Sequence, residues 1–558
     1  MLTILGPRRG SGITNTSGYC GAGGIDLGFS WTGIELILGM NHNELSLATH
    51  QRNFPQARHD CIDIQAVPDE EIKLFPATDF SAWGAECKYQ STASGEKLLH
   101  QGQRSLWSDM DEEKLHVERS RATMREVVRW ATAMKDHHTP YRAILVENVP
   151  EVMHWSGIKS WYKDMYALGY RCQTICFNSM FAQAALSPSL AEQVYPVAQN
   201  RNRWYTICTQ QGNPAPDVDF RPRAWCHRCS QEVEAKQVWK ECARVRAVEV
   251  IGQTILWGDY GEQYVYFCPT CDKEVVPYFT PASAMLDWSL PIQQIGTRDS
   301  SLAENTVKRI NKGLQRFYRD SSGRIPFLMN LSHTESDHDY TSLVALPMHT
   351  QDSSQTTGVV IPSGRENPEY IFHILPTSWE IEYKTQKIRE QKTRHGKKFT
   401  REAMEQLIAS IEEHYREGVR RYLDELPVYL KAYREPPPLP PSRLLERGFI
   451  ASYHNGSDCL AGLQEPIRTI DSHDRHGICL QPSIFEGMPH LEDCYYRMLH
   501  AKEVKRAMGI PESYIIEATS QREEVRQCGL AVTPAVATLF MLRVLASLGE
   551  EVTTLECA

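Results

Sequence analysis

One pair of neighbouring segments restricts the fold of this chain more than any other feature. Residues 121–136, RATMREVVRWATAMKD, carry apolar side chains at helical spacing, and residues 142–149, RAILVENV, follow as a nearly continuous apolar run. Such a run is typical of a strand buried on both faces, as in a parallel sheet covered by helices. The same alternation extends from about residue 11 to 210, so we expect an α/β domain with a Rossmann-like, doubly wound and mostly parallel sheet.

The length of the chain indicates further domains. At 558 residues, the chain exceeds the size at which a single hydrophobic core usually stops growing. An irregular region rich in turn residues follows residue 210, and helical periodicity returns at 494–549. The stretch VTPAVATLFMLRVLASLG in this last part is apolar around most of a helix, which predicts a buried helix that returns to the first domain.

We therefore divide the chain into four parts. Residues 1–210 and 491–558 form the first domain, 211–300 form an insertion with paired cysteines, and 301–490 form a large irregular α+β domain. The α+β domain contains a charged helical insert at about 378–433 and a proline-rich segment at 434–443, which has the composition of a stiff connector. Residues 347–358 and 466–477 share five residue types at a constant offset, which is either a two-copy repeat or a chance match.

The composition favours a cytoplasmic, monomeric protein without a membrane partner. Apolar residues make up 41% of the chain and charged residues 23%, and no apolar run approaches the roughly 20 residues that span a bilayer. The first residues lack the apolar core of a signal peptide. The net charge of −9 gives no overall attraction to nucleic acid. The best local candidate for phosphate contacts is the segment 382–401, with eight Lys or Arg against two Glu, although such runs are equally often solvated helix faces.

Two CxxC pairs indicate a metal site. The pairs are separated by 38 residues and consist of Cys226 with Cys229 and Cys268 with Cys271. Four thiolates at this spacing match a closed, tetrahedral structural zinc site. The plain alternative, four incidental core thiols, does not explain the aromatic and proline residues beside both pairs. We expect zinc to stabilise a ribbon-like segment that is too small for a core of its own.

A glycine cluster lies where a strand is expected to turn into a helix. Gly21, Gly23 and Gly24 in SGYCGAGGIDLGF (17–29) would let backbone N–H groups approach a cofactor. The plain alternative is a tight turn, and Ser17 and Gly18 before it make a poor strand. Taken by itself, the cluster is therefore a weak signal.

Polar residues follow other predicted strands. Asp63 comes after a short β-like run, and Glu147 and Asn148 stand at the carboxyl end of the apolar strand, where open α/β sheets bind ligands. Arg201 and Arg203 are two residues apart in PVAQNRNRWYTIC (196–208), so on a strand both side chains would face the same way. The plain alternatives are a loop aspartate and solvated arginines.

The order of these motifs resembles that of the DNA (cytosine-5) methyltransferases, in their bacterial and phage branch. GYCGAGG, the cysteine of GAECKYQSTASG (84–95), ENV, QNRNR, KRAMGIP and GLAVTP follow one another as in that family, and ATHQRNFP (48–55) and DWSLP (287–291) resemble this branch. The resemblance covers roughly residues 15–210 and 494–545. It implies a class I methyltransferase fold, and the long segment between the two parts matches the place of the family's target-recognition domain.

The resemblance also implies a reaction on double-stranded DNA. Cys87 would add to C6 of a flipped cytosine, and a methyl group would pass from S-adenosylmethionine to C5. Glu147, followed by Asn148, would act at N3 of the base, while Arg203, supported by Arg201, would hold the O2 edge and orient the glutamate. The residues that would contact the methyl donor are Tyr19, Gly21, Gly23 and Gly24 in the glycine loop, Asn41 at the ribose and Asp63 at the adenine.

Three residues depart from the family pattern. Glu86 precedes Cys87 where a proline is usual, Asn41 replaces the acidic residue at the ribose, and Leu530 replaces the asparagine of the last motif. A lone cysteine is most often a small core residue, and only the downstream motifs favour a nucleophile. The alternatives that remain are a relative with a different one-carbon donor or a modified S-adenosylmethionine, a tRNA-modifying enzyme, and a DNA-binding relative without catalysis. Neither the DNA target sequence nor a restriction partner is encoded visibly.

Overall fold

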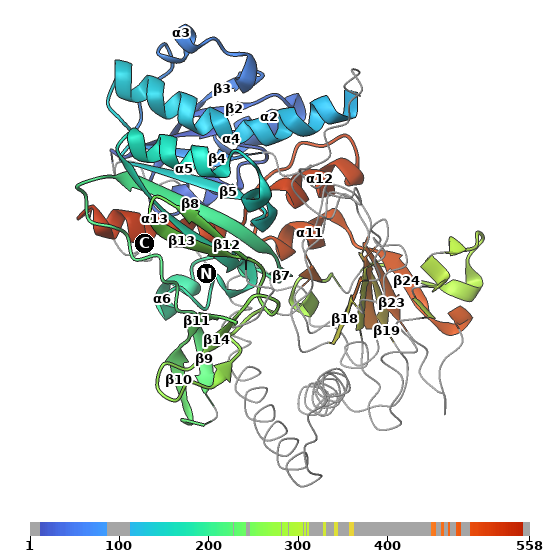
Figure 1. Ribbon diagram of the computed structural model, residues 1–558. Helices are drawn as coiled ribbons and strands as arrows, with labels where there is room; N and C mark the ends of the chain where they lie inside the picture. The colour runs from blue at the N-terminus through green and yellow to red at the C-terminus, as the bar shows by residue number, and fades with distance from the viewer. Residues whose placement is uncertain are drawn as a thin grey trace, which may run out of the picture.

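The computed structural model describes residues 12–85, 112–311 and 491–550, apart from short gaps, together with the strands between residues 327 and 480 (Figure 1). The gaps are at 227, 241–245, 281, 288–289, 305 and 309. Cys87, the helical insert 378–433 with its basic segment, and the proline-rich segment 434–443 lie outside the described residues.

A seven-stranded sheet forms the first domain. Its order is β3-β2-β1-β4-β5-β8-β6, and β8 runs antiparallel to its two neighbours, while the other strands are parallel to one another. The strands are β1 (Thr14–Gly18), β2 (Glu35–Asn41), β3 (Arg58–Cys61), β4 (Phe80–Gly84), β5 (Ala143–Asn148), β6 (Tyr170–Asn178) and β8 (Asn202–Gln210). The doubly wound, mostly parallel sheet predicted from the sequence is confirmed, and this strand order is that of the class I methyltransferases.

Helices cover both faces of this sheet (Figure 1). They are α1 (Gly24–Ser30), α2 (Glu44–Asn53), α3 (Asp69–Ile72), α4 (Glu112–His137), α5 (Ile158–Ala167), α6 (Pro188–Ala191), α11 (Ala501–Ala507), α12 (Gln521–Leu530) and α13 (Pro534–Ser547), with 3-10 turns η1 (Ile64–Ala66), η3 (Pro150–His154) and η4 (Ser179–Phe181). The helix predicted at 121–136 lies within α4, and the strand predicted at 142–149 is β5.

The C-terminal helix returns to the first domain, as predicted. A Cβ atom at Gly28 in α1 would lie 2.3 Å from the carbonyl oxygen of Pro534, and the Thr538 hydroxyl donates to the Gly28 carbonyl at 3.0 Å, so α1 and α13 are in close contact. The segment Gln521–Ser547 is long and apolar enough to cross a membrane by composition, but 83% of its most apolar window is buried inside the fold. Its hydrophobicity is therefore that of a core element.

Strand β1 forms despite its unfavourable last residues. Ser17 and Gly18 were expected to make a poor strand, yet both belong to β1. The ring of Trp83 fills the place that a side chain at Gly18 would need, because an added Cβ would lie 2.2 Å from it. The Ser17 hydroxyl is satisfied by the Asp26 carboxylate at 2.6 Å. Packing and hydrogen bonding from distant residues thus override the local β-propensity.

The cysteine-rich insertion consists of short antiparallel strands. They form the pairs β10-β9 and β12-β13 and the three-stranded sheet β11-β14-β15. The strands are β9 (Arg223–Cys226), β10 (Gln231–Glu234), β11 (Lys236–Trp239), β12 (Arg246–Val250), β13 (Gln253–Trp257), β14 (Tyr264–Phe267) and β15 (Glu274–Val275). The β12-β13 hairpin contacts α5 and β6 of the first domain, so the insertion is packed on the seven-stranded sheet.

A second, eight-stranded sheet is formed by strands between residues 293 and 498. Its strands are β16 (Gln293–Gln294), β17 (Phe327–Asn330), β18 (Tyr340–Leu343), β19 (Thr357–Ile361), β20 (Gly448–Ser452), β21 (Cys459–Gly462), β23 (His476–Leu480) and β24 (Tyr495–Met498). Strands β16 and β24 lie just outside the predicted range 301–490. Thr357 and His476, which occupy equivalent positions in the two copies of the suspected repeat, are parallel register partners, which favours a true repeat over a chance match.

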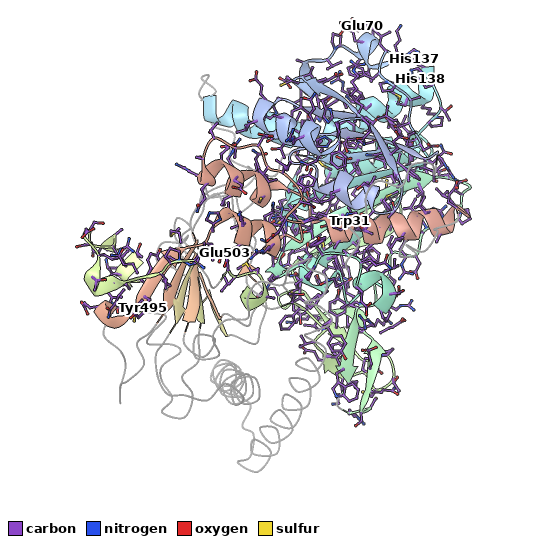
Figure 2. The ribbon with its side chains drawn as sticks, turned by 180° about the vertical axis from the view of Figure 1, so that it is seen from behind. Trp31, Glu70, His137, His138, Tyr495 and Glu503 are labelled. Carbon is purple, nitrogen blue, oxygen red and sulfur yellow. The ribbon has the colours of Figure 1, made fainter. Side chains whose placement is uncertain are left out.

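A buried carboxylate joins this domain to the first. Glu503 of α11 is fully buried, accepts hydrogen bonds from both terminal nitrogens of Arg497 next to it at 2.7 and 2.8 Å, and accepts one from the N–H of Asp287 at 2.8 Å. Figure 2 shows Glu503 where α11 lies near the strands of the second sheet. A second link is the parallel pair β22 (Ile467–Arg468) with β7 (Gln199–Asn200).

Candidate active site

The glycine loop joins β1 to α1 as predicted. Tyr19 and Gly21 both have φ of 53°, and Gly23 has φ of 81° where it begins α1. The left-handed region suits glycine but strains Tyr19. A Cβ at Gly21 would meet nothing within 4 Å, whereas one at Gly24 would lie 2.0 Å from the carbonyl oxygen of Val532. The loop therefore faces open space on one side and the C-terminal segment on the other.

Asn41 and Asp63 stand at the same edge of the sheet as the loop. Asn41 ends β2, and its Oδ1 accepts a hydrogen bond from the N–H of Asn43 at 2.9 Å. Asp63 follows β3 and begins η1, where its Oδ1 accepts from the N–H of Gln65 at 3.1 Å. Open space at Gly21 and polar groups after β2 and β3 fit a nucleoside cofactor laid across the strand ends. Asn41 offers such a ligand an amide donor in place of the two acceptors of a carboxylate.

Glu147 and Arg203 form a buried ion pair at the end of β5. Nε of Arg203 lies 2.9 Å from Oε1 of Glu147, and the two residues are 5% and 6% exposed. Oε1 accepts no aligned hydrogen bond from the part of the chain that the structure describes. A buried acid of this kind keeps hydrogen-bonding capacity for a ligand.

Arg201 has a different target. Its terminal nitrogens donate to the carbonyl oxygens of Gly529 and Ala531 at 3.0 and 3.1 Å. Between those two carbonyls, Leu530 stands 47% exposed. β7 ends at Asn200 and β8 begins at Asn202, so Arg201 lies between two strands and holds the GLAVTP segment. Its supporting role beside Arg203 stays a prediction.

Asn148 fixes the end of the neighbouring strand. Its side chain, which is fully buried, donates to the Ala85 carbonyl at 3.4 Å and accepts from the N–H of Val149 at 2.8 Å. Gly84, the last residue of β4, is the register partner of Glu147. Cys87 follows three residues later in the sequence and lies outside the described residues.

A row of buried, hydrogen-bonded polar side chains lies under the glycine loop, and the sequence analysis did not predict it. His50 is fully buried, and its two ring nitrogens lie 2.9 Å from Oδ2 of Asp26 and 2.8 Å from Nε2 of His59. Burial lowers the pKa of His50, but Cys20 and Asp26 outweigh it and raise that pKa to about 10. Burial and the charge of His50 lower the pKa of His59. His50 belongs to the stretch ATHQRNFP. A polar histidine in this amphipathic helix was the one sequence signal that could have indicated these hydrogen-bonded side chains.

The four cysteines form one cluster, as predicted. Their sulfur atoms all lie within 4.8 Å of one another, with Cys226 to Cys271 at 3.5 Å and Cys229 to Cys268 at 3.9 Å. Tetrahedral zinc with bonds of about 2.3 Å requires sulfur atoms roughly 3.8 Å apart. The cluster therefore fits a four-thiolate metal ion, and none of the four cysteines is in a disulfide.

One family of known proteins is similar to the part of the chain that contains the candidate site. The family model of the C-5 cytosine-specific DNA methylases matches residues 15–241, which include the glycine loop, the Glu147–Arg203 pair and Arg201. The match covers less than half of the 558-residue chain, so it shows what residues 15–241 are similar to, a family of C-5 cytosine-specific DNA methylases.

Solved structures give weaker likenesses. A DNA modification methyltransferase encoded within an E. coli prophage has 13% sequence identity and a TM-score of 0.38, with 97% of this chain and 100% of that chain covered. The Entamoeba histolytica methyltransferase EhMeth has 8% identity and a TM-score of 0.41 (96% and 98% covered), and the S. pombe Dnmt2 methyltransferase has 11% and 0.40 (96% and 98%). None of the curated proteins compared with the chain matches it.

Proposed function

We propose that this protein is a DNA cytosine C5 methyltransferase that adds Cys87 to C6 of a flipped cytosine. The observation that carries the proposal is the buried Glu147–Arg203 ion pair at the carboxyl end of β5, inside the segment that matches the cytosine-5 family model. Two further features support it. Gly84 is the register partner of Glu147 and precedes Cys87 by three residues, and the glycine loop opens at the same sheet edge.

The residues divide the chemistry between them. The thiolate of Cys87 forms a bond to C6, which makes C5 electron-rich enough to attack a methyl group. The carboxyl group of Glu147 supplies a proton to N3 in a hydrogen bond and so stabilises the negative charge that the addition places on the ring. Arg203 orients Glu147 through their ion pair. S-adenosylmethionine supplies an electrophilic methyl group when bound. After transfer, loss of the C5 proton breaks the Cys87–C6 bond and releases the free enzyme.

Duplex DNA is the proposed substrate because of the second domain. The chain between β21 and β23 of its eight-stranded sheet forms β22, which pairs with β7 directly before Arg201. A tRNA substrate is the competing possibility, since the chemistry is the same on either nucleic acid. A donor other than S-adenosylmethionine is favoured by one observation, the amide of Asn41 at the ribose position.

Labelled S-adenosylmethionine tests these possibilities together. The purified protein is incubated with unmethylated genomic DNA or with unmodified tRNA, and the nucleosides are analysed by mass spectrometry. We expect 5-methylcytosine in DNA only. Cys87→Ser should abolish it, and Glu147→Gln should lower the rate by about 100-fold or more. Methylation of tRNA alone, a different added group, or activity that survives Cys87→Ser would each contradict the proposal.

A further inference from the structure

The turn between β13 and β14 is anchored on the catalytic sheet. The N–H of Gly258 donates to Sγ of Cys176 on β6 at 3.5 Å, and the N–H of Tyr260 donates to Oδ1 of Asn202 at the start of β8 at 3.1 Å. Asp259 stands between these two contacts. The 258–261 turn belongs to the cysteine-rich insertion, yet two of its backbone amides bond to residues of β6 and β8.

This anchoring leads directly to the Glu147–Arg203 pair. Asn202, which receives the hydrogen bond from the turn, precedes Arg203, and its carbonyl oxygen accepts from Nη1 of Arg203 at 2.7 Å. The guanidinium reaches Glu147 with Nε at 2.9 Å. A shift of the turn would therefore move the residue that holds one side of the Arg203 guanidinium.

The turn has a single compact conformation. A Cβ at Gly258, whose φ is 148°, would lie 2.5 Å from the Gln263 side chain, and that side chain accepts from the N–H of Asp259 at 2.7 Å. The ring of Tyr260 packs on Phe181 of η4 with centroids 4.8 Å apart. The insertion thus presents Asp259 from a rigid support, which is what a positioning group requires.

The charges around Asp259 connect it to the active site. Burial, and then the nearby Glu151 carboxylate, raise the pKa of Asp259 to about 7, while Arg246 and Arg203 act in the opposite direction. Burial likewise raises the pKa of Glu151, which Arg203 and Arg246 counteract. The titratable and charged groups that face Asp259 are Glu151 from η3, Arg203 from β8, Arg246 from β12, Cys176 from β6 and Glu262 from its own turn.

We propose that the 258–261 turn is a positioning element of the active site and that Asp259 is its positioning residue, acting through Arg203 on Glu147. Asp259 and Glu151 are acidic groups that interact with the positive charge of Arg203. The turn holds Asn202, whose carbonyl oxygen holds the Arg203 guanidinium beside Glu147, so Glu147 is kept in place for N3 of the base. This role depends on the proposed methyltransferase function.

A metal ion at the four cysteines would help to fix the position of the turn. β14 leads from the turn to Cys268, and it pairs with β11 and β15. Gln237 of β11 also donates to the Cys176 carbonyl at 2.9 Å. A metal ion bound to the four thiolates would hold one end of β14, while the 258–261 turn holds the other end against the seven-stranded sheet. The insertion would therefore act on catalysis as well as on stability.

The first test uses the full-length, metal-loaded protein with labelled S-adenosylmethionine and genomic DNA. We expect Asp259→Asn to lower kcat by about tenfold while KM for DNA, the Kd for S-adenosylmethionine and the thermal midpoint stay unchanged. The wild type should show an inflection near pH 7 in the dependence of kcat on pH, and this inflection should be absent from the Asp259→Asn variant. Glu249→Gln, which removes an exposed carboxylate from the same insertion, is the matched control and should behave like the wild type. Unchanged kcat in Asp259→Asn, an equal loss in Glu249→Gln, or a loss that follows a lower thermal midpoint would overturn the proposal.

The second test needs no activity. Hydrogen exchange is followed by mass spectrometry before and after a chelator removes the metal, and in the Gly258→Ala variant. Peptides that contain residues 199–204 should exchange at least several-fold faster in both cases, while peptides from β1 to β3 should not change. If peptides of 223–271 alone respond, the turn does not position Arg203. Absence of methyl transfer by the wild type would instead refute the proposed function, and the exchange result would still decide whether the insertion controls Arg203.

Discussion

The amide of Asn41 is the residue that most directly tests how the cofactor is held. Its Oδ1 is used by the N–H of Asn43, so only the NH₂ group remains for a ribose hydroxyl, whereas a carboxylate could keep the same turn contact and accept from the ribose with its second oxygen. We predict that Asn41→Asp lowers the Kd for S-adenosylmethionine by about tenfold, since a charged hydrogen bond contributes roughly 1.5–3 kcal/mol.

Isothermal titration measures this Kd without any substrate DNA. Asn43→Asp is the control, because it adds the same charge two residues away at the cap of α2. Equal tightening in both variants would mean that the added charge acts at long range. A Kd that stays constant or rises in Asn41→Asp would indicate that the donor at this edge carries no free ribose diol.

His50 should make stability depend on pH in the alkaline range. Its pKa is raised in the folded protein to about 10 from the usual 6.5, so its contribution to stability is complete below about pH 6.5 and is lost as the pH rises through about 10. His59 has a lowered pKa and therefore acts only below about pH 6.5, where protonation favours the unfolded chain. Measurements from pH 7 to 10 therefore separate the effect of His50 on stability from that of His59.

Replacement of His50 tests this assignment. His50→Leu leaves the buried Asp26 carboxylate without its cationic partner, and we expect a loss of about 3–5 kcal/mol at pH 7. The difference from the wild type should shrink toward pH 10. Denaturation midpoints across this range measure the effect, with His42→Leu at an exposed position as the control. A difference that is constant with pH would show that His50 is neutral in the folded protein.

Contacts between elements explain which glycines the fold requires. A Cβ at Gly24 would lie 2.0 Å from the Val532 carbonyl oxygen, while one at Gly21 would meet nothing within 4 Å, although Gly21 has φ of 53°. Gly24→Ala should therefore separate α1 from the segment before α13 and cost about 3 kcal/mol, as overpacking does. Gly21→Ala should cost only about 1 kcal/mol for its backbone conformation.

Thermal unfolding of the two variants compares these effects. The midpoint should fall clearly further for Gly24→Ala than for Gly21→Ala, whereas cofactor binding should weaken more in Gly21→Ala, because its added methyl group enters the open side of the loop. The reverse order of thermal midpoints would mean that the loop and the C-terminal segment do not touch as described.

Elements with a strong local signal could be predicted, and those that depend on distant contacts could not. The helix α4 and strand β5 followed from periodicity because their side chains are buried in a regular pattern. Strand β1 was doubtful because its support comes from Trp83 and Asp26, which lie elsewhere in the sequence. The partners of Arg201 could not be predicted for the same reason: the Gly529 and Ala531 carbonyls come from a segment more than 300 residues away.

At the scale of the whole chain, too, features with a local sequence signal could be predicted, and contacts between distant segments could not. Four cysteines with CxxC spacing indicated their own cluster, because the spacing itself encodes the geometry of a metal ion. The sequence also indicated that the C-terminal part returns to the first domain. It gave no sign that the insertion contacts the residue before Arg203, since a turn such as 258–261 has no periodicity. The role of Cys87 stays a prediction from motif order.

Metal removal should disorder the cysteine-rich insertion. The thiolate cluster fits one tetrahedral ion, so we predict one zinc ion per chain by elemental analysis and visible bands of tetrahedral sulfur coordination after cobalt substitution.

The insertion has only two- and three-stranded sheets and would lose most of its order without the ion. A chelator should therefore expose residues 223–271 to limited proteolysis and lower the thermal midpoint. Cys229→Ser should reproduce this effect, while Cys61→Ser, at an exposed cysteine of β3, should not. Retention of the wild-type cleavage pattern in the metal-free protein would show that packing on β6 and α5 suffices to fold the insertion.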